Sequence, residues 1–244
     1  MKKFLVFSIA AILSLKVAAQ TNLQVMYDFG SDRNQVTTTF EMFKPDKWGD
    51  TFFFIDHEFG DNDNGDGTVS RDFPSGTYFE IARGLNFWQN TKLAPLSLHV
   101  EYNGGVYRGF GVNNTWLFGL NWFVHSKDFK NTLTLEVLYK TIKAKEQAVP
   151  MQFTIVWGMK DIFGVKRLNF SGFADFWWED HVAGPKFDML KRSTFISEPQ
   201  LWYQIGDLFG CPNLNIGGEV ELSGNFGTYD GFKCNPCLGA KWDF

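Results

Sequence analysis

Aromatic and acidic side chains alternate with other residues in two short segments, Val36–Phe43 and Thr51–Glu58. Successive side chains of a β-strand point to opposite faces, so every second residue shares a face. One face then collects phenyl rings and carboxylates: Glu41, Phe43, Phe52, Phe54, Asp56 and Glu58. Aromatic rings stack on flat heterocycles, and carboxylates accept hydrogen bonds from hydroxyl or amine groups. The two segments therefore predict a surface that offers both kinds of contact to a solute.

The same mixture recurs later in the chain. Glu80, Phe173 and Asp175 lie on the polar faces of two further alternating segments and complete the predicted binding set. The wider polar face carries many more acids than bases, with Lys140 and Lys241 as the clearest bases. Its other members are His99, Glu101, Glu136, Glu179, Glu198, Trp202, Glu219, Glu221 and Asp243.

Turn residues join the first two segments into a hairpin. Pro45 fixes its own φ, Asp46 can bond to nearby backbone, and Gly49 tolerates unusual backbone angles. One face of this hairpin is too aromatic for a wet surface, and the other is too acidic for a dry core. A membrane β-barrel, with lipid outside and a polar lumen inside, reconciles the two faces.

Alternation of this kind recurs in about twelve segments, an even number, as in bacterial single-chain barrels. We therefore predict an all-β fold, a transmembrane antiparallel β-barrel of about 12 strands with short periplasmic turns and longer extracellular loops. The alternative is a secreted β-sandwich, whose strands have an apolar face in the core and a polar face in water. It is disfavoured because the more polar face here is rich in carboxylates and the apolar face carries Trp, Tyr and Phe in strand after strand. The segments are Leu23–Phe29, Val36–Phe43, Thr51–Glu58, Thr77–Leu85, Leu96–Tyr102, Thr115–Val124, Leu133–Lys140, Gln152–Met159, Leu168–Glu179, Phe195–Gly206, Leu214–Ser223 and Cys234–Phe244.

A recurring Asp-x-aromatic pattern marks the turns that we predict to face the periplasm, where the aromatic rings would lie at the membrane interface. Its copies are Asp46-Lys47-Trp48, Asp128-Phe129, Asp161-Ile162-Phe163, Asp207-Leu208-Phe209 and the looser Asn86-Phe87-Trp88. Asn103–Asn114 is predicted as a loop, and Gly60–Gly76 and Glu179–Ser193 as loops that face outside. The first of these outer loops resembles a calcium loop at Asn62, Asn64, Asp66 and Gly67, but Phe73 replaces the glutamate that binds through both oxygens.

The N-terminus carries an export signal. Met1–Ala19 is predicted to be a secretory signal peptide, with residues 20–244 forming the barrel. Its apolar run is too short for the alternative, an uncleaved membrane anchor, and no cysteine follows it to accept lipid. Removing Lys2, Lys3 and Lys16 leaves 20 of the 23 basic side chains against 27 acidic ones, so the net charge changes from −4 to −7. This charge argues against nucleic-acid binding.

Three cysteines, Cys211, Cys234 and Cys237, leave at least one thiol unpaired within the chain. Cys234 and Cys237 have the spacing of a local disulfide or a redox pair, but barrels are stabilised by closure and incidental small residues are the preferred interpretation. We predict no metal and no cofactor. The C-terminal segment places Leu238, Ala240, Trp242 and Phe244 on one face, and resembles the signal by which the barrel-assembly machinery binds outer-membrane proteins.

The chain also resembles the Tsx family of nucleoside-specific outer-membrane channels, including Bacteroidetes-type relatives of unassigned function. The resemblance rests on Glu41-Met42-Phe43, Trp48, Asp50, Asp56, Tyr78-Phe79-Glu80-Ile81, Lys160-Asp161-Ile162-Phe163-Gly164 and Gly172-Phe173-Ala174-Asp175-Phe176-Trp177-Trp178. In the last stretch an aspartate replaces the asparagine of the family. The resemblance implies a monomeric barrel in the outer membrane of a Gram-negative bacterium. Its narrow pore would bind nucleosides through aromatic and ionisable lumen residues.

Two alternatives to a nucleoside channel remain open. A generic porin would use the same carboxylates only to hydrate its pore. An outer-membrane enzyme such as a lipase needs a serine and an orienting acid beside a histidine. The chain has His57, His99, His125 and His181, yet no serine and acid can be assigned to any of them, so we predict that the protein is not an enzyme. A purely structural or adhesin-like barrel is disfavoured by its modest loops.

Overall fold

The structure, a computed structural model, describes residues 20–30, 33–63, 68–107 and 110–244. Twelve antiparallel strands form one closed sheet, as the alternation predicts. They are β1 (Gln20–Asp28), β2 (Gln35–Asp46), β3 (Gly49–Phe59), β6 (Gly76–Leu85), β7 (Leu96–Tyr107), β8 (Phe110–His125), β9 (Asn131–Ile142), β10 (Met151–Met159), β11 (Leu168–Ala183), β12 (Met189–Ser197) with its continuation β13 (Gln200–Gln204), β14 (Leu214–Gly224) and β15 (Phe232–Asp243). Two short 3₁₀ turns, η1 (Ile162–Gly164) and η2 (Gly206–Leu208), lie between strands.

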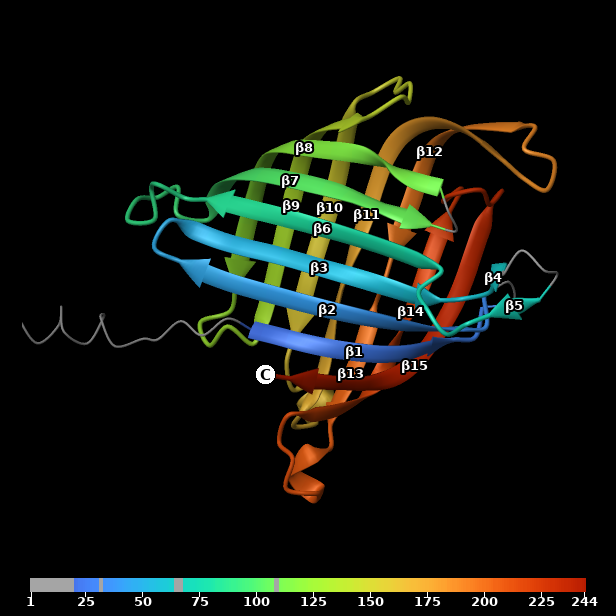
Figure 1. Ribbon diagram of the computed structural model, residues 1–244. Helices are drawn as coiled ribbons and strands as arrows, with labels where there is room; N and C mark the ends of the chain where they lie inside the picture. The colour runs from blue at the N-terminus through green and yellow to red at the C-terminus, as the bar shows by residue number, and fades with distance from the viewer. Residues whose placement is uncertain (1–19, 31–32, 64–67, 108–109) are drawn as a thin grey trace, which may run out of the picture.

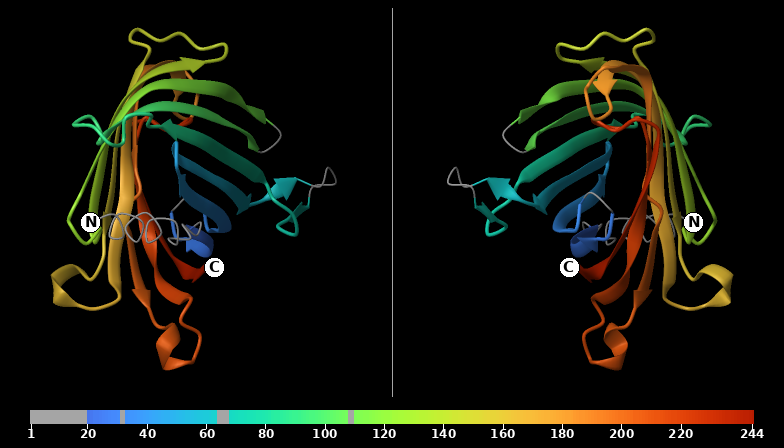
Figure 2. Two further views of the ribbon diagram at one scale, coloured as in Figure 1. Left: turned by 90° about the vertical axis from the view of Figure 1, so that its left-hand side faces the viewer. Right: turned by 90° about the vertical axis from the view of Figure 1, so that its right-hand side faces the viewer.

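Pairing of the first and last strands closes the barrel. β1 and β15 are antiparallel over Asn22–Asp28 and Cys237–Asp243, with Leu23 opposite Trp242. Figure 1 shows these two strands side by side, with β1 beginning and β15 ending at the same end of the molecule. At the opposite end, β4 (Asn62–Asp63) and β5 (Val69–Ser70) pair in the loop between β3 and β6. Figure 2 shows this small hairpin projecting away from the barrel wall.

The outer wall of the barrel is apolar. The outward side chains of neighbouring strands remain exposed although they are large and hydrophobic, for example Val137 at 48% and Leu238 at 63%. Water-soluble monomers rarely expose a continuous apolar surface of this size, so the wall is suited to lipid. No helix in the described part of the chain is long and apolar enough to cross a membrane.

We expect Val137→Lys to destabilise the membrane-inserted barrel by about 2–4 kcal/mol, because Val137 lies on the outward face in the middle of β9 and a lysine there would meet lipid. Guanidinium unfolding in lipid vesicles, followed by tryptophan fluorescence, would measure the change. Phe163→Lys is the control, since Phe163 lies in the η1 turn and is 94% exposed. Equal stabilities of the two variants would contradict a lipid-facing wall.

All five copies of the Asp-x-aromatic pattern lie at the end where β1 begins and β15 ends. Asp46, Asn86 and Asp128 each accept a hydrogen bond from the backbone N–H two residues later, at 2.7, 3.2 and 3.2 Å. Such Asx turns help to reverse the chain locally. Hydrogen bonds from Arg83 and from the Trp48 N–H lower the pKa of Asp46 to about 2. That this end faces the periplasm stays a prediction.

Two predicted loops are shorter than expected. Asn103–Asn114 is mostly strand, because β7 continues to Tyr107 and β8 begins at Phe110. The pairing shifts by a bulge between Asn103 and Gly105, and a Cβ on Gly105 would lie 2.2 Å from the Thr77 carbonyl oxygen. Glycine is therefore needed for strand packing here and not for a turn. Glu179–Ser193 is also largely strand, and only Gly184–Asp188 connects β11 with β12.

The predicted strand Phe195–Gly206 begins earlier and is interrupted. β12 starts at Met189, and the break falls at Glu198 and Pro199, because proline has no N–H for the ladder. The Phe173 carbonyl accepts hydrogen bonds from the Glu198 N–H at 3.1 Å and from the Ser197 hydroxyl at 2.7 Å. The break therefore keeps its backbone groups satisfied and leaves the barrel closed.

The cysteines form no disulfide. Cys234 is exposed and Cys237 is buried, since they lie three residues apart on β15 and point to opposite faces. The Cys234–Cys237 disulfide that their spacing allowed is therefore absent. The calcium interpretation cannot be followed, because Asn64, Asp66 and Gly67 lie outside the described residues. Asn62 donates from Nδ2 to the Phe73 carbonyl oxygen at 2.9 Å.

Candidate functional site

All nine predicted binding residues lie on the inward face of the barrel. In the opening hairpin, strand pairing places Glu41 opposite Phe54 and Phe43 opposite Phe52. Phe54 in turn pairs with Glu80 on β6. Asp56 and Glu58 continue the same face of β3, and Phe173 and Asp175 share the inward face of β11. The structure therefore places these residues toward the lumen, while their role in binding stays a prediction.

Three inward rings form a continuous aromatic surface. The ring centroids of Phe52 and Phe54 lie 6.0 Å apart, and those of Phe54 and Tyr78 lie 5.9 Å apart. Tyr78 was missing from the predicted set, although the alternation that identified Glu80 on the same strand also indicates it. The surface crosses from β3 to β6 and offers more than one place to stack a heterocycle.

Hydrogen-bond acceptors surround this aromatic surface. The Tyr78 hydroxyl donates to Glu80 Oε1 at 2.6 Å, and Asn103 Nδ2 donates to the same oxygen at 3.1 Å. The Oδ1 atoms of Asp56 and Asn103 are buried without a partner in the described residues. Buried polar atoms are nearly always satisfied by protein, water or ligand. These acceptors therefore suit a solute that carries hydroxyl or amine donors.

Asp175 belongs to a chain of hydrogen bonds on the opposite wall. Lys140 Nζ donates to Gln152 Oε1 at 2.6 Å, Gln152 Nε2 donates to the Thr154 hydroxyl at 2.9 Å, and that hydroxyl donates to Asp175 Oδ1 at 2.6 Å. The Lys140 ammonium also lies 3.8 Å from the centroid of the Trp177 ring. This chain holds the Asp175 carboxylate at a fixed position on the wall.

Carboxylates line opposite walls of the lumen. Asp175 on β11 interacts electrostatically with Glu80 on β6, across the barrel. Asp56 on β3 interacts in the same way with Glu198 and Glu219 on the far wall. An acidic passage of this kind concentrates cations and repels anions.

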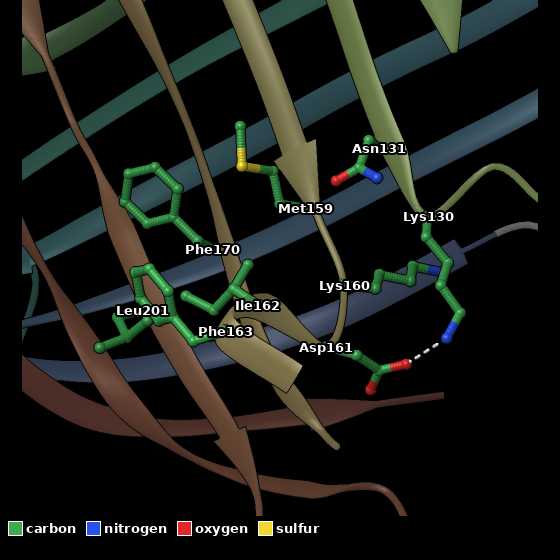
Figure 3. A pocket seen from close by; sticks show the side chains of 9 residues that line it. All are labelled: Lys130, Asn131, Met159, Lys160, Asp161, Ile162, Phe163, Phe170 and Leu201. Carbon is green, nitrogen blue, oxygen red and sulfur yellow. Dashed lines mark hydrogen bonds and ion pairs between the residues drawn. The ribbon is translucent and has the colours of Figure 1, made fainter. Parts of the chain in front are cut away.

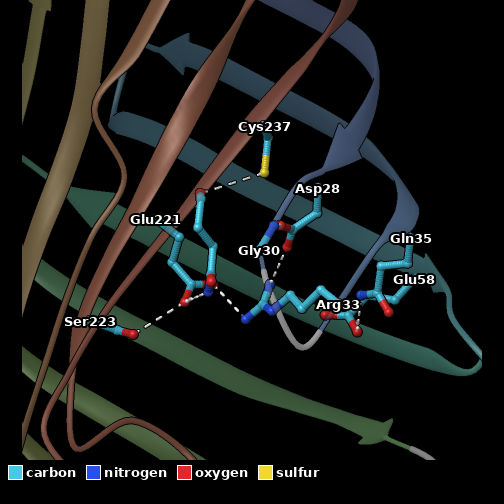
Figure 4. A network of polar contacts seen from close by, with 9 residues as sticks. Asp28, Gly30, Arg33, Gln35, Glu58, Glu221, Ser223 and Cys237 are labelled. Atoms are coloured by element: carbon cyan, nitrogen blue, oxygen red, sulfur yellow. Dashed lines mark hydrogen bonds and ion pairs between the residues drawn. The ribbon is translucent and has the colours of Figure 1, made fainter.

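A second polar network closes over the lumen at the end opposite the Asp-x-aromatic turns (Figure 4). Arg33 leaves the connection between β1 and β2 and bonds to Asp28 at 3.2 Å and to Glu221 at 2.7 Å. Glu58 lies nearby and accepts a hydrogen bond from Gln35 at 2.9 Å. Arg33 could not be predicted from the sequence, because it lies in a connection where no alternation indicates the direction of its side chain.

Trp202 fills the lumen toward the other end. Its side chain is fully buried and clusters with Met26 and Cys237. The indole N–H donates to Gln200 Oε1 at 2.9 Å, and the Lys241 ammonium lies 4.8 Å from the ring centroid. The ring therefore narrows the passage beside the β1–β15 seam.

The nine predicted residues do not form one site. Phe52, Phe54, Asp56 and Glu80 form the central group, and Asp175 faces them from the other wall. Glu58 belongs to the network around Arg33. Phe43 lies near the turn between β2 and β3, and Glu41 accepts a hydrogen bond from Asn22 at 3.0 Å. Phe173 lies on β11 beside the break between β12 and β13.

One hollow of the described structure lies outside the lumen. It has a volume of about 790 Å³ and lies beside the turn between β10 and β11. Lys130 Nζ lies 2.5 Å from Asp161 Oδ2 at its rim, and Figure 3 shows the two side chains pointing toward each other. Met159 and Phe170, which line it, belong to the outward faces of their strands. This hollow therefore faces lipid, and it is not the predicted solute site.

Comparison with family models places the whole barrel in one family. The model described as "Domain of unknown function (DUF5020)" matches residues 19–244. The chain belongs to the DUF5020 family. A comparison of the DUF5020 chain with curated proteins found no match.

Solved structures show what the DUF5020 barrel is similar to. The NanC porin in a rhombohedral crystal form has a TM-score of 0.55 at 8% sequence identity, and the match covers 92% of this chain and all (100%) of that one. The KdgM porin in complex with disordered oligogalacturonate has a TM-score of 0.48 at 9% identity, with 92% and 99% covered. At such identities the similarity to the NanC porin indicates a common fold and nothing about the solute.

Proposed function

We propose that this DUF5020 protein is an outer-membrane channel for passive uptake of small solutes, and that nucleosides are its preferred solutes. The observation that carries the proposal is the aromatic surface of Phe52, Phe54 and Tyr78, bordered by Asp56 and Glu80 inside a closed barrel. The lipid-suited outer wall and the resemblance to the Tsx family support the location. In this proposal the outward residues of β15 and the chain end, Leu238, Ala240, Trp242 and Phe244, present the barrel to the assembly machinery.

A nucleoside fits the chemistry of this surface. Its base stacks on a phenyl ring, and each such contact contributes roughly 1–3 kcal/mol in proteins that bind single-stranded nucleic acid. Its ribose hydroxyls and exocyclic amines donate hydrogen bonds, which suits the buried acceptors Asp56 Oδ1 and Asn103 Oδ1. Nucleotides are disfavoured, because their phosphates would enter a passage lined mainly by carboxylates.

We expect Phe54→Ala to weaken the block of ion current by adenosine by roughly 1–3 kcal/mol, because it removes the middle ring of the aromatic surface. Single-channel recordings with adenosine, adenosine monophosphate and a sugar of similar size would measure the effect. Phe53→Ala is the matched control, since the Phe53 ring projects outward from the same strand.

A generic porin gives a different result in the same recordings. Phe54→Ala would then only widen the pore and raise its conductance for all small solutes alike. If adenosine interrupts the wild-type current no more than the sugar does, the nucleoside proposal is wrong. The outward-facing His57 does not support the lipase alternative. Its Nδ1 lies 2.8 Å from the Thr77 hydroxyl, and a lipase would need a serine at that place.

A further inference from the structure

The inward face of β7 carries the one histidine of the described residues that contacts two carboxylates. His99 Nε2 lies 2.9 Å from Glu101 Oε2, and His99 Nδ1 lies 3.7 Å from Glu136 Oε1. All three side chains are about nine-tenths buried. His99, Glu101 and Glu136 can each offer one nitrogen or oxygen atom to a metal ion, and these three atoms lie within 4.8 Å of one another.

The two contacts of His99 differ in kind. A neutral imidazole has one N–H, and Glu101 at 2.9 Å is at hydrogen-bonding distance from Nε2. Nδ1 then carries a lone pair that faces Glu136 at 3.7 Å, too far for a hydrogen bond. Two ligand atoms of one tetrahedral Zn²⁺ ion, each about 2.0–2.2 Å from it, lie about 3.4 Å apart. The space between Nδ1 and Glu136 therefore matches the separation across a bound cation.

An independent observation adds a third oxygen. Asn121 is 92% buried, since its exposed fraction is 8%, and its Oδ1 has no partner in the described residues. Strand pairing places Asn121 directly opposite Glu136 on the inward face. Directly opposed residues have Cβ atoms about 4.5–5.5 Å apart, so the amide is within reach of the same point.

The surroundings of His99 supply negative charge for a cation. Glycines flank His99 on both neighbouring strands, Gly84 on β6 and Gly119 on β8. The Asp50 carboxylate occupies the space over Gly84, where a Cβ would lie 2.6 Å from Asp50 Oδ2. No lysine or arginine of the described residues forms an ion pair with Glu101 or Glu136. The His99 imidazole therefore lies among three carboxylates, those of Asp50, Glu101 and Glu136.

We propose that the barrel binds one divalent transition-metal ion of the zinc class through His99 Nδ1, Glu136 and Asn121 Oδ1. Glu101 accepts the Nε2–H and orients the ring, as carboxylates do behind metal-binding histidines. Imidazole with oxygen ligands suits zinc and its neighbours better than magnesium or calcium. The site does not depend on which solute the channel passes, because it is built from side chains of the wall alone.

Isothermal titration calorimetry of the full chain in detergent, after treatment with a chelator, tests this site. We expect one Zn²⁺ per chain, with Mg²⁺ bound at least 100-fold more weakly. His99→Gln and Glu136→Gln should each weaken Zn²⁺ binding at least 100-fold, and Glu101→Gln about 10–100-fold. His57→Gln is the matched control, since this histidine lies on the outward face, and it should bind Zn²⁺ like the wild type.

Circular dichroism of each variant would show that the barrel is folded, and Co²⁺ in place of Zn²⁺ would report the ligands through its visible absorption spectrum. Loss of the Co²⁺ bands in folded Asn121→Leu is expected if the amide oxygen is a ligand. The proposal is overturned if the wild type binds no Zn²⁺, if folded His99→Gln binds it as tightly as the wild type, or if Mg²⁺ binds equally well. In those cases the three side chains are a hydrogen-bonded charge cluster only. None of these results depends on nucleoside transport.

Discussion

Arg33→Met is expected to lower the free energy of unfolding by about 3–5 kcal/mol. The guanidinium is the cation paired with both Asp28 and Glu221, whose side chains are only 2% and 7% exposed. Removing one partner of a buried ion pair leaves uncompensated buried charge, which is far more costly than losing an exposed pair. The methionine keeps most of the length of the side chain, so the decrease in the free energy of unfolding comes from the lost charge and not from lost volume.

Guanidinium unfolding in vesicles at neutral pH would measure this loss. Lys130→Met is the control, since the Lys130 pair with Asp161 is accessible to solvent on both sides and lies at the other end of the barrel, so its removal should cause little change. Adding Glu221→Gln to Arg33→Met should restore part of the stability, because it removes one of the stranded charges. If the Arg33→Met barrel is as stable as the wild type, the Asp28 and Glu221 carboxylates are stabilised by water and not by Arg33.

Trp202→Ala should have the second large effect, on stability and on conductance together. The ring is fully buried inside the lumen against Met26 and Cys237. Deleting a buried tryptophan costs about 3–5 kcal/mol, through lost burial and the cavity that remains. Because this cavity lies in the passage itself, the conductance of each folded channel should increase.

Unfolding curves and single-channel recordings on the same preparation would separate the two effects. Trp48→Ala is a suitable control, because Trp48 lies in the turn between β2 and β3 and is half exposed (50%). It should change neither quantity appreciably. A Trp202→Ala channel that is destabilised but conducts like the wild type would place the narrowest point of the passage elsewhere.

The strands and their faces could be predicted because alternation is a local property. Leu133, Leu135 and Val137 indicate the outward face of β9 without knowledge of its neighbours. The extent of β7 could not be predicted in this way. Gly104 and Gly105 indicate a loop by composition. Only the structure shows that Gly105 lies in a strand, where the close approach of the Thr77 carbonyl oxygen requires a glycine.

The inward direction of the predicted site residues could be derived from the sequence, but their arrangement could not. Alternation shows that Glu80 and Asp175 both point inward, yet it cannot show that they face each other across the lumen. That relation depends on strand tilt and on closure of the whole sheet. Arg33 was missed for a related reason, since its partner Glu221 lies 188 residues away in the sequence.

The β1–β15 seam has a consequence for how fast the protein reaches its native state. Every other ladder of the barrel joins strands that follow one another along the chain, so those hairpins can form early and locally. The seam joins Asn22 to Asp243, nearly the whole chain apart. Bringing such distant segments together costs about 5 kcal/mol in loop-closure entropy before the ladder forms. Seam formation is therefore expected to limit the folding rate, and destabilising changes in β1 or β15 should slow folding more than equal changes in β8 or β9.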